Sequence, residues 1–231
     1  PVQKRLVLST ASVMVLLCFT FVSVHPTSVA HRERVKKEEI VPQIISHVQD
    51  QNVNLEEDEL KTIAEMVYDE SIKCGVDYRL VLAIMKVESN FKQNAVSEQG
   101  ARGLLQVKPS LAKYIAPDAG VKWRGDKTLD EPDKNIKIGV HFFSKLVEDF
   151  DKNITMALHA YHVGPTRLRT ILTEKKKPQK RYLNLVLDEY GETARTFHHH
   201  NPLRRSPPDK DHCAYRIDVE LKLRIKSQCL L

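Results

Sequence analysis

The chain has 231 residues, enough for one domain of moderate size with a sizeable hydrophobic core. Its formal net charge is +6, and a basic excess of this kind suits an anionic partner such as nucleic acid, anionic lipid or an anionic polymer. Because no stripe of Lys and Arg interleaved with aromatic residues occurs, we do not expect the chain to bind nucleic acid.

An uncharged segment lies close to the start of the chain. Lys4 and Arg5 precede residues 6–24, which carry no charge, and small residues follow at 28–30. The length of this segment lies between the core of a long signal peptide and a short membrane span. We therefore predict that residues 1–30 are a signal peptide or a membrane anchor and that the rest of the chain is extracytoplasmic. If the segment is retained, residues 6–24 associate the chain with a membrane.

Residues 31–53 are charged and then mixed polar, which indicates a linker, and a domain is predicted over residues 54–191. The first helix of this domain has apolar residues at helical spacing, namely Leu60, Ile63, Ala64, Val67, Tyr68 and Ile72. Gly75 is expected to end the helix, since glycine readily adopts the left-handed conformation that follows many helices.

The next helical segment runs from Leu80 to Val87 and is apolar on every side except at Lys86, a pattern that predicts a buried helix. Glu88 follows at its C-terminal end. The last turn of a helix is the negative end of its dipole, and apolar neighbours also disfavour charge, so both raise the pKa of a carboxyl group there. This is the profile of a general acid, although an ordinary exposed Glu at a frayed helix end is the alternative interpretation.

Polar and small residues fill the turns after Glu88, namely Asn90, Asn94, Ser97, Gln99, Gly100, Gly103 and Gln106. Amides and hydroxyl groups next to glycines suit hydrogen bonding to a neutral polyol, because glycine permits tight turns and the close approach of a ligand.

An amphipathic helix is predicted from Ile136 to Phe150, with Asp133 or Asn135 as its N-terminal cap. Gly139 lies inside this helix. A glycine there costs stability, so we expect another part of the chain to pack closely against it.

A final helix is predicted over residues 182–190, and Gly191 is expected to stop it. Residues 192–231 are predicted to be an irregular tail. Within it, strict alternation of polar and apolar residues over 216–226 indicates a strand.

Histidines and cysteines of the tail raise the question of a metal site. Three adjacent histidines at 198–200 lie near Cys213, but the spacing does not suit metal ligation, so neither a metal nor another cofactor is predicted. Cys74, Cys213 and Cys229 are available for a disulfide in an exported protein, and their pairing stays open.

Two ordered stretches of the domain resemble one known family. The first runs from Glu88 to Pro109 as ESNFKQNAVSEQGARGLLQVKP, and the second from Asn135 to Pro165 as NIKIGVHFFSKLVEDFDKNITMALHAYHVGP. They are similar to the two signatures of the soluble-type lytic transglycosylases, which belong to the lysozyme-like superfamily, and the similarity covers roughly residues 54–190. The resemblance implies an all-α, lysozyme-like domain packed around the buried Glu-bearing helix.

The implied activity is that of a peptidoglycan lytic transglycosylase in the periplasm or cell envelope. Such an enzyme cleaves the β-1,4 bond between MurNAc and GlcNAc without water and forms 1,6-anhydro-MurNAc ends. Glu88 matches the family's acid, which then acts as a base for the C6 hydroxyl group of the substrate, while the substrate's acetamido group stabilises the cation at C1. Peptidoglycan carries anionic stem peptides, which suits the basic charge of the chain.

Glycoside hydrolysis usually needs two carboxylates. The candidates for a second carboxylate lie in polar, loop-like surroundings, namely Glu98, Asp118, Asp126 and Asp130. A single working carboxylate fits a transglycosylase better than a hydrolase.

Tyr161 matches the tyrosine of the family's second motif, and the resemblance implies that its hydroxyl group points towards Glu88 and orients it. A purely structural ring in the core is the alternative for Tyr161. His162 stands where the family has Asn, and we count it among the glycan-binding residues because an imidazole still donates one hydrogen bond.

Four further residues are predicted to bind the glycan. Ser97 and Gln106 match polar positions that line the family's glycan cleft, with a turn as the alternative role of Ser97. Lys108 adds a charge that suits a stem-peptide carboxylate. Tyr182 follows the segment Pro-Gln-Lys-Arg, where the family often has a Glu-Thr pair.

Two alternatives to the transglycosylase remain. A goose-type lysozyme relative would hydrolyse the same bond with a loop Asp. A wall-binding or assembly scaffold would keep the fold with weak catalysis, an interpretation that His162 and the segment before Tyr182 keep open. Peptidoglycan strands are the predicted partner, and no protein partner is predicted.

Overall fold

The computed structural model describes residues 32–51, 53 and 55–199, with only the backbone described for 198 and 199. The chain divides into two compact units, and we describe each by itself. The smaller unit ends at Ile40, and its residues 32–40 are helical. The larger unit begins at Val41 and holds the candidate site. Its described residues form helices and no strand, with isolated bridges from Arg102 to Val96 and Val107, which confirms the predicted all-α fold.

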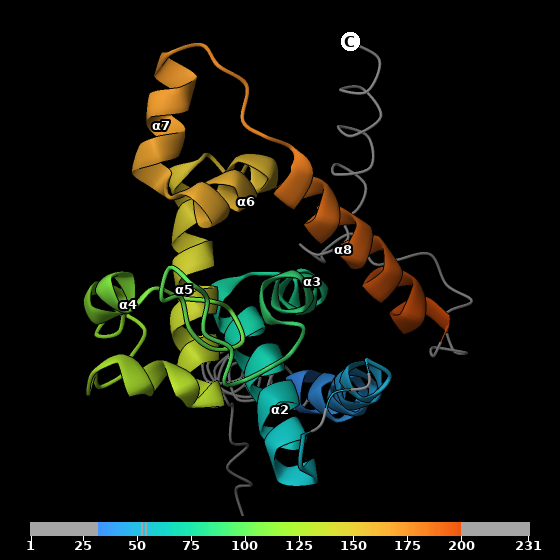
Figure 1. Cartoon of the computed structure of the whole chain (residues 1–231). Helices are drawn as coiled ribbons and strands as arrows, with labels where there is room; N and C mark the ends of the chain where they lie inside the picture. The colour runs from blue at the N-terminus through green and yellow to red at the C-terminus, as the bar shows by residue number, and fades with distance from the viewer. Residues whose placement is uncertain (1–31, 52, 54, 200–231) are drawn as a thin grey trace, which may run out of the picture. The chain divides into compact units, whose positions relative to one another are not determined.

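Four long helices form the core of the larger unit (Figure 1). Helix α2 (Glu57–Cys74) packs along α5 (Pro132–Asp149), while α3 (Tyr78–Ser89) contacts α2 and packs along α8 (Arg181–His199). Each of the residues 80–85 is at most 1% exposed, which confirms that α3 is the buried helix predicted from its apolar pattern.

Shorter helices complete the unit, namely α4 (Pro109–Ile115), the 3-10 helix η1 (Asp126–Asp130), α6 (Ile154–Val163) and α7 (Pro165–Thr173). Helix α6 contacts α5, α7 and α8, and the chain crosses from α7 to α8 beside it (Figure 1). Helix α2 ends as predicted, with Gly75 in the left-handed conformation at a φ of 64°.

Two boundaries differ from the prediction. Helix α8 continues through Gly191 to His199, so the expected helix end at Gly191 is wrong, and residues 192–199 are not an irregular tail. Thr193, Ala194 and Phe197 are buried. Their burial offsets the ~1 kcal/mol that a glycine costs inside a helix.

The predicted linker also contains part of the core. Residues 41–49 are helical, and Val41, Ile44 and Val48 are buried. The ring of His47 contacts two aromatic rings of the same unit, with centroids 6.4 Å from Phe91 and 5.7 Å from Phe197. The sequence does not reveal this helix because its apolar stretch is short and is interrupted by Pro42 and by polar residues.

Other predictions fall on residues outside the described part of the chain. These are the signal or anchor segment at 1–30, the strand at 216–226, and Cys213 and Cys229. Within the described residues, no helix has the length and apolar character needed to span a membrane, and Cys74 is a free cysteine.

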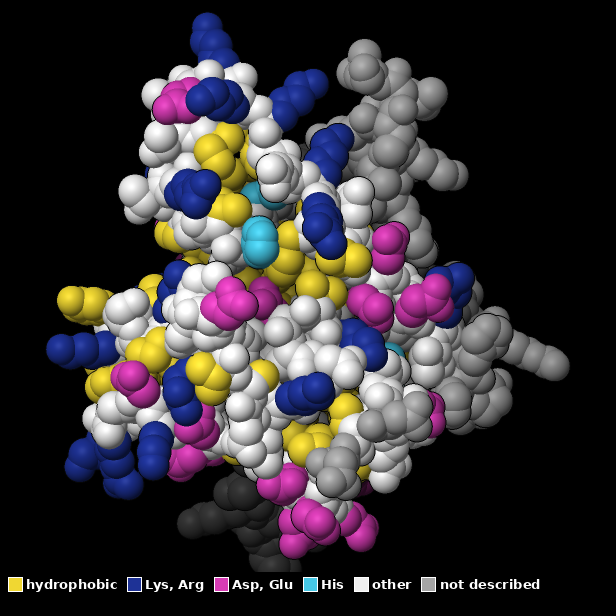
Figure 2. Space-filling model, in the orientation of Figure 1, with side chains coloured by type: hydrophobic (Ala, Val, Ile, Leu, Met, Phe, Trp, Pro, Cys, Tyr) yellow, Lys and Arg dark blue, Asp and Glu magenta, His cyan; other side chains and the backbone are white. Residues whose placement is uncertain are grey.

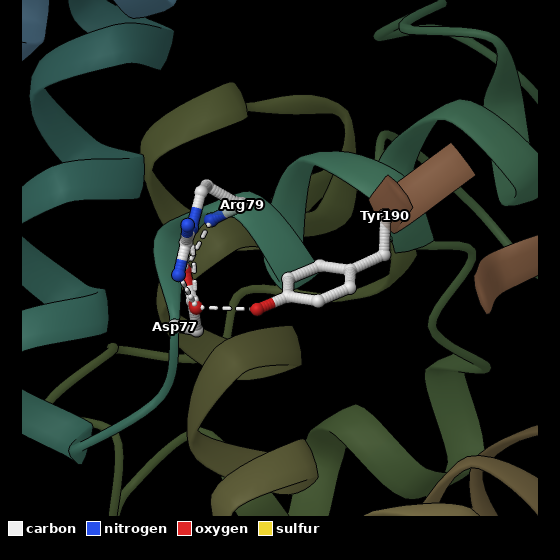
Figure 3. A network of polar contacts seen from close by, with 3 residues as sticks. All are labelled: Asp77, Arg79 and Tyr190. Atoms are coloured by element: carbon white, nitrogen blue, oxygen red, sulfur yellow. Dashed lines mark hydrogen bonds and ion pairs between the residues drawn. The ribbon is translucent and has the colours of Figure 1, made fainter. Parts of the chain in front are cut away.

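A buried polar network ties the start of α3 to the middle of α8 (Figure 3). The carboxylate of Asp77 caps α3 by accepting a hydrogen bond of 2.9 Å from the backbone N–H of Arg79. It also accepts hydrogen bonds from the Arg79 guanidinium, the shortest at 2.6 Å, and one of 2.9 Å from the Tyr190 hydroxyl group. This network fixes α8 against α3, and α8 carries Tyr182.

Candidate active site

Glu88 is the next-to-last residue of α3, and its side chain is half-buried where the helix meets α8. Burial raises the pKa of Glu88 from 4.5 to about 7, against a hydrogen bond from Tyr182 that acts in the opposite direction. The direction agrees with the expectation from its position at the end of an apolar helix. A carboxyl group with this pKa exchanges its proton near neutral pH.

Tyr182 is the group that holds the Glu88 carboxyl. It lies in the first turn of α8, is 7% exposed, and donates a hydrogen bond of 2.7 Å from its hydroxyl group to Oε1 of Glu88. Burial raises the pKa of Tyr182 well above its ordinary value, so the hydroxyl group stays a donor. The sequence predicts Tyr182 as a glycan-binding residue and gives no sign of its hydrogen bond to Glu88.

Tyr161 makes a different bond from the expected one. Its hydroxyl group donates to the backbone oxygen of Leu105 at 2.6 Å, and its ring packs against Phe142 and Phe143. A hydroxyl group has a single proton to donate, so the expected hydrogen bond from Tyr161 to Glu88 is wrong. The charge of Glu88 still contributes to raising the pKa of Tyr161, and a catalytic role for Tyr161 stays a prediction.

The chain leaves Glu88 through a strained turn. Asn90 and Phe91 both adopt the left-handed conformation, with φ of 51° and 59°, and Phe91 is 1% exposed. The Ser89 hydroxyl group lies 2.8 Å from the oxygen of Leu104 and holds the loop between α3 and α4, residues 90–108, against this turn. Strain of this kind persists only where surrounding contacts impose it, and it is common at functional sites.

Asn135 is a residue of the site that sequence analysis missed. The sequence predicts it as a possible cap, but Glu131 occupies the N-cap position of α5, and Asn135 lies in the first turn, fully buried. Its Oδ1 accepts from the N–H of Leu105, and its Nδ2 donates to the oxygens of Arg102 and Leu129, all at 2.9 Å. The signal was its position on the same helix face as the apolar stripe of α5.

Two glycines allow the loop to approach α5. A Cβ on Gly103 would lie 2.1 Å from Nδ2 of Asn135 and 2.4 Å from the oxygen of Leu129. A Cβ on Gly139 would lie 2.5 Å from Cδ1 of Leu105. The close packing expected at Gly139 is therefore confirmed, and it positions the same Leu105 whose carbonyl group binds Tyr161.

Ser97 and Gln106 hold the loop from within. Ser97 Oγ accepts a hydrogen bond of 3.0 Å from the N–H of Ala101. Gln106 Nε2 donates to the backbone oxygens of Ala95 and Gly103 at 3.1 and 2.9 Å. These bonds give both side chains a loop-shaping role, and their predicted contact with a glycan stays a prediction.

Lys108 and His162 are both exposed. Lys108 stands at the start of α4. His162 follows Tyr161 on α6, and its ring stacks on Tyr182 with centroids 4.3 Å apart and an interplanar angle of 8°. On the face shown in Figure 2, histidine side chains lie among hydrophobic ones. Lys and Arg side chains are frequent above them, and Asp and Glu side chains lie below.

The other candidate carboxylates have different surroundings. Asp118 pairs with Lys145, whose hydrogen bond and charge lower the pKa of Asp118. Asp130 pairs with Arg102 through two hydrogen bonds of 2.9 and 2.7 Å. Glu98 and Asp126 are exposed. Over the described ranges, no group of three or more His, Cys, Asp or Glu residues is arranged to hold a metal ion.

Comparison with known proteins places the chain in a family. Residues 65–184 match the family described as the transglycosylase SLT domain. This match covers just over half of the chain, so the chain belongs to the transglycosylase SLT domain family. The resemblance found in the two sequence stretches is thereby confirmed, together with the lysozyme-like helical fold.

Individual relatives are similar over part of their length. The soluble lytic murein transglycosylase of Salmonella typhimurium is 35% identical over 92 residues, which are 39% of this chain and 14% of that protein. The endo-type membrane-bound lytic murein transglycosylase A of Salmonella paratyphi B is 32% identical over 130 residues, 51% of this chain and 63% of that protein. The chain therefore spans less than two thirds of either relative.

A solved structure shows the same fold. It is the X-ray structure of an inactive Glu-to-Gln mutant of the lytic transglycosylase Slt from Pseudomonas aeruginosa. The similarity has a TM-score of 0.53 at 25% identity and covers 59% of this chain and 24% of that chain.

Proposed function

We propose that this chain is a peptidoglycan lytic transglycosylase that cleaves the β-1,4 bond between MurNAc and GlcNAc and leaves 1,6-anhydro-MurNAc ends. The observation that carries the proposal is Glu88, a half-buried carboxyl group with a pKa of about 7 and a 2.7 Å hydrogen bond from Tyr182. The names of the two Salmonella relatives support murein as the substrate, and the Glu-to-Gln change in the inactive Pseudomonas protein supports an essential Glu.

In the first half of the reaction Glu88 is the acid. Because Tyr182 donates to Oε1, the transferable proton resides on Oε2, and the carboxyl group presents that oxygen to the glycosidic oxygen. The proton moves from Oε2 to the leaving O4 of GlcNAc as the bond from C1 breaks. The acetamido group of MurNAc stabilises the positive charge at C1.

In the second half Glu88 is the base. Its carboxylate takes the proton of the MurNAc C6 hydroxyl group while the C6 oxygen bonds to C1. Glu88 therefore regains the proton that it gave in the first half. A pKa near the working pH suits a group that must both give and take a proton. Tyr182 stabilises the carboxylate formed between the two halves by its hydrogen bond.

Hydrolysis would need a second group to activate water. Among the candidates, Asp118 is bound to Lys145 and Asp130 to Arg102, which favours the reaction with one carboxylate. We further propose that the glycan binds beside the loop shaped by Ser97 and Gln106, with exposed Lys108 available to a stem-peptide carboxylate.

We infer an extracytoplasmic location, in the periplasm or cell envelope, because that is where a murein substrate lies. A membrane-bound relative supports it. The export or anchoring role of residues 1–30 stays a prediction.

Mass spectrometry of purified wall digested with the protein tests the proposed function. We expect muropeptides with 1,6-anhydro ends, which are one water lighter than the products of hydrolysis. Glu88→Gln keeps the shape of the side chain but not its acid, so release should fall by at least ~100-fold. Reducing ends alone would indicate a hydrolase, and wall binding without release would indicate a scaffold; either result overturns the proposal.

A further inference from the structure

The stack between His162 and Tyr182 joins two helices at the candidate active site. His162 comes from the last turn of α6 and Tyr182 from the first turn of α8. Their rings lie face to face, with centroids 4.3 Å apart and an interplanar angle of 8°. One of these two rings carries the hydroxyl group that binds Glu88.

The position of Tyr182 in its own helix explains why such a contact matters. Tyr182 is the second residue of α8, immediately after the connection from α7. The first turn of a helix lacks the full set of backbone hydrogen bonds that fixes residues further along. Contacts from other elements must therefore set the direction of its ring, and the stack with His162 covers one face of it.

His162 and Tyr182 differ in their exposure to solvent. Tyr182 is 7% exposed, whereas His162 is exposed. The imidazole therefore covers the phenol ring rather than being enclosed itself. Burial of its packed face lowers the pKa of His162, which favours the neutral form of the ring beside Tyr182.

We propose that His162 is a positioning residue for Glu88, whose stacked ring holds Tyr182 so that its hydroxyl group points at Oε1 of the carboxyl group. This role acts through Tyr182 and differs from the direct glycan contact expected from the sequence. It rests on the proposed function for its catalytic consequence, but the arrangement of Tyr182 and Glu88 is testable without any substrate.

The test combines His162→Ala, Tyr182→Phe and the double variant. The hydrogen bond from Tyr182 lowers the pKa of Glu88, so Tyr182→Phe should raise the midpoint of the Glu88 titration, measured by carbon-13 NMR of its carboxyl group. His162→Ala should move the midpoint upward over part of the same distance. In the Tyr182→Phe background His162→Ala should move it no further, because coupled residues are not additive.

Kinetics supply the second readout. We expect His162→Ala to lower kcat about tenfold and to change KM by less than about twofold, since it disturbs the acid and leaves glycan contacts in place. His162→Phe keeps a flat ring against Tyr182 and should recover most of the midpoint and of kcat.

Three results would overturn the positioning role. They are an unchanged or lowered Glu88 midpoint in His162→Ala, an equal further shift in the Tyr182→Phe background, and a rise in KM with kcat intact. Absence of anhydro products from the wild-type protein would instead overturn the proposed function, and the NMR midpoints would still decide the role of His162.

Discussion

At the scale of single residues, the proposed reaction requires that the Glu88 carboxyl group be buried and still able to ionise. Burial at the end of α3 raises its pKa to about 7, and the donated proton of Tyr182 limits that rise. The same burial makes the ionised form costly to the folded state. The proposed acid therefore reduces stability at pH values where it is charged, a compromise common in active sites.

Glu88→Gln should reveal how much stability the folded protein loses when Glu88 ionises. The folded protein binds the Glu88 proton more tightly than the unfolded chain, so wild-type stability falls as pH rises from about 4.5 through 7. Gln does not ionise. Well above pH 7 the variant should be more stable by as much as about 3 kcal/mol, the equivalent of the pKa change, and below pH 4.5 the two should converge. Denaturant unfolding across this pH range measures the difference, and a pH-independent difference would contradict the account.

Tyr161→Phe and Tyr182→Phe form a matched pair of hydroxyl deletions. Tyr161 binds the Leu105 carbonyl group, so its loss should lower stability by about 1 kcal/mol and leave the Glu88 midpoint in place. Tyr182→Phe should raise that midpoint and cost more activity. If Tyr161→Phe moved the midpoint further than Tyr182→Phe, the assignment of the Glu88 partner would be wrong.

At the scale of elements, the conformation of the loop after α3 depends on contacts that no local sequence pattern predicts. The burial of α3 followed from its apolar residues, and the packing at Gly139 followed from a glycine inside a helix. The three hydrogen bonds of Asn135 could not be predicted, because they join backbone groups from two distant segments. Asn is also a frequent helix cap, which favoured the wrong interpretation.

The hydrogen-bond partner of Glu88 could not be predicted from a local sequence pattern either. Tyr161 and Tyr182 both lie close to the site, and only the path of the loop decides that Leu105 takes the hydroxyl group of Tyr161. The end of α8 was misplaced for a related reason. A glycine commonly ends a helix, and the tertiary burial of Phe197 outweighs that preference here.

Gly103→Ala and Gly100→Ala test the loop against α5. Both glycines have similar left-handed φ, 76° and 75°, so both variants should lose roughly 1–2 kcal/mol to backbone strain. A Cβ at 100 meets nothing within 4 Å, whereas at 103 it meets Asn135 and the Leu129 carbonyl group. We expect Gly103→Ala to lose clearly more stability and most activity, measured by unfolding and wall digestion. Equal losses in the two variants would show that the contact with Asn135 is unimportant.

At the scale of the whole larger unit, α3 and α8 run antiparallel, and hydrogen bonds at both ends of α3 join it to the first half of α8. Tyr190 binds Asp77 at the start of α3, and Tyr182 binds Glu88 at its end, across 113 and 94 residues of sequence. The apolar residues of α3 fill the space between the two ties. The helix pair thus positions Glu88 through two separate hydrogen bonds. The bond from Tyr190 to Asp77 holds the helices together, and the bond from Tyr182 contacts the candidate acid itself.

Tyr190→Phe should separate stability from chemistry. It removes a hydrogen bond to the buried Asp77 carboxylate, worth about 1.5–3 kcal/mol, at the end of the helix pair remote from Glu88. We expect a lower melting temperature with an unchanged Glu88 midpoint, the reverse of Tyr182→Phe. A shifted midpoint in Tyr190→Phe would mean that the two ties are not independent.

The central claim is that Glu88 is an acid held near neutral pKa by burial. Its titration by carbon-13 NMR, assigned by comparison with Glu88→Gln, tests this most directly when anhydro-muropeptide release is measured on the same preparation. We expect a midpoint at about pH 7 and release that declines above the same pH. A midpoint near the ordinary value of 4.5, or release that persists unchanged well above the midpoint, would contradict it.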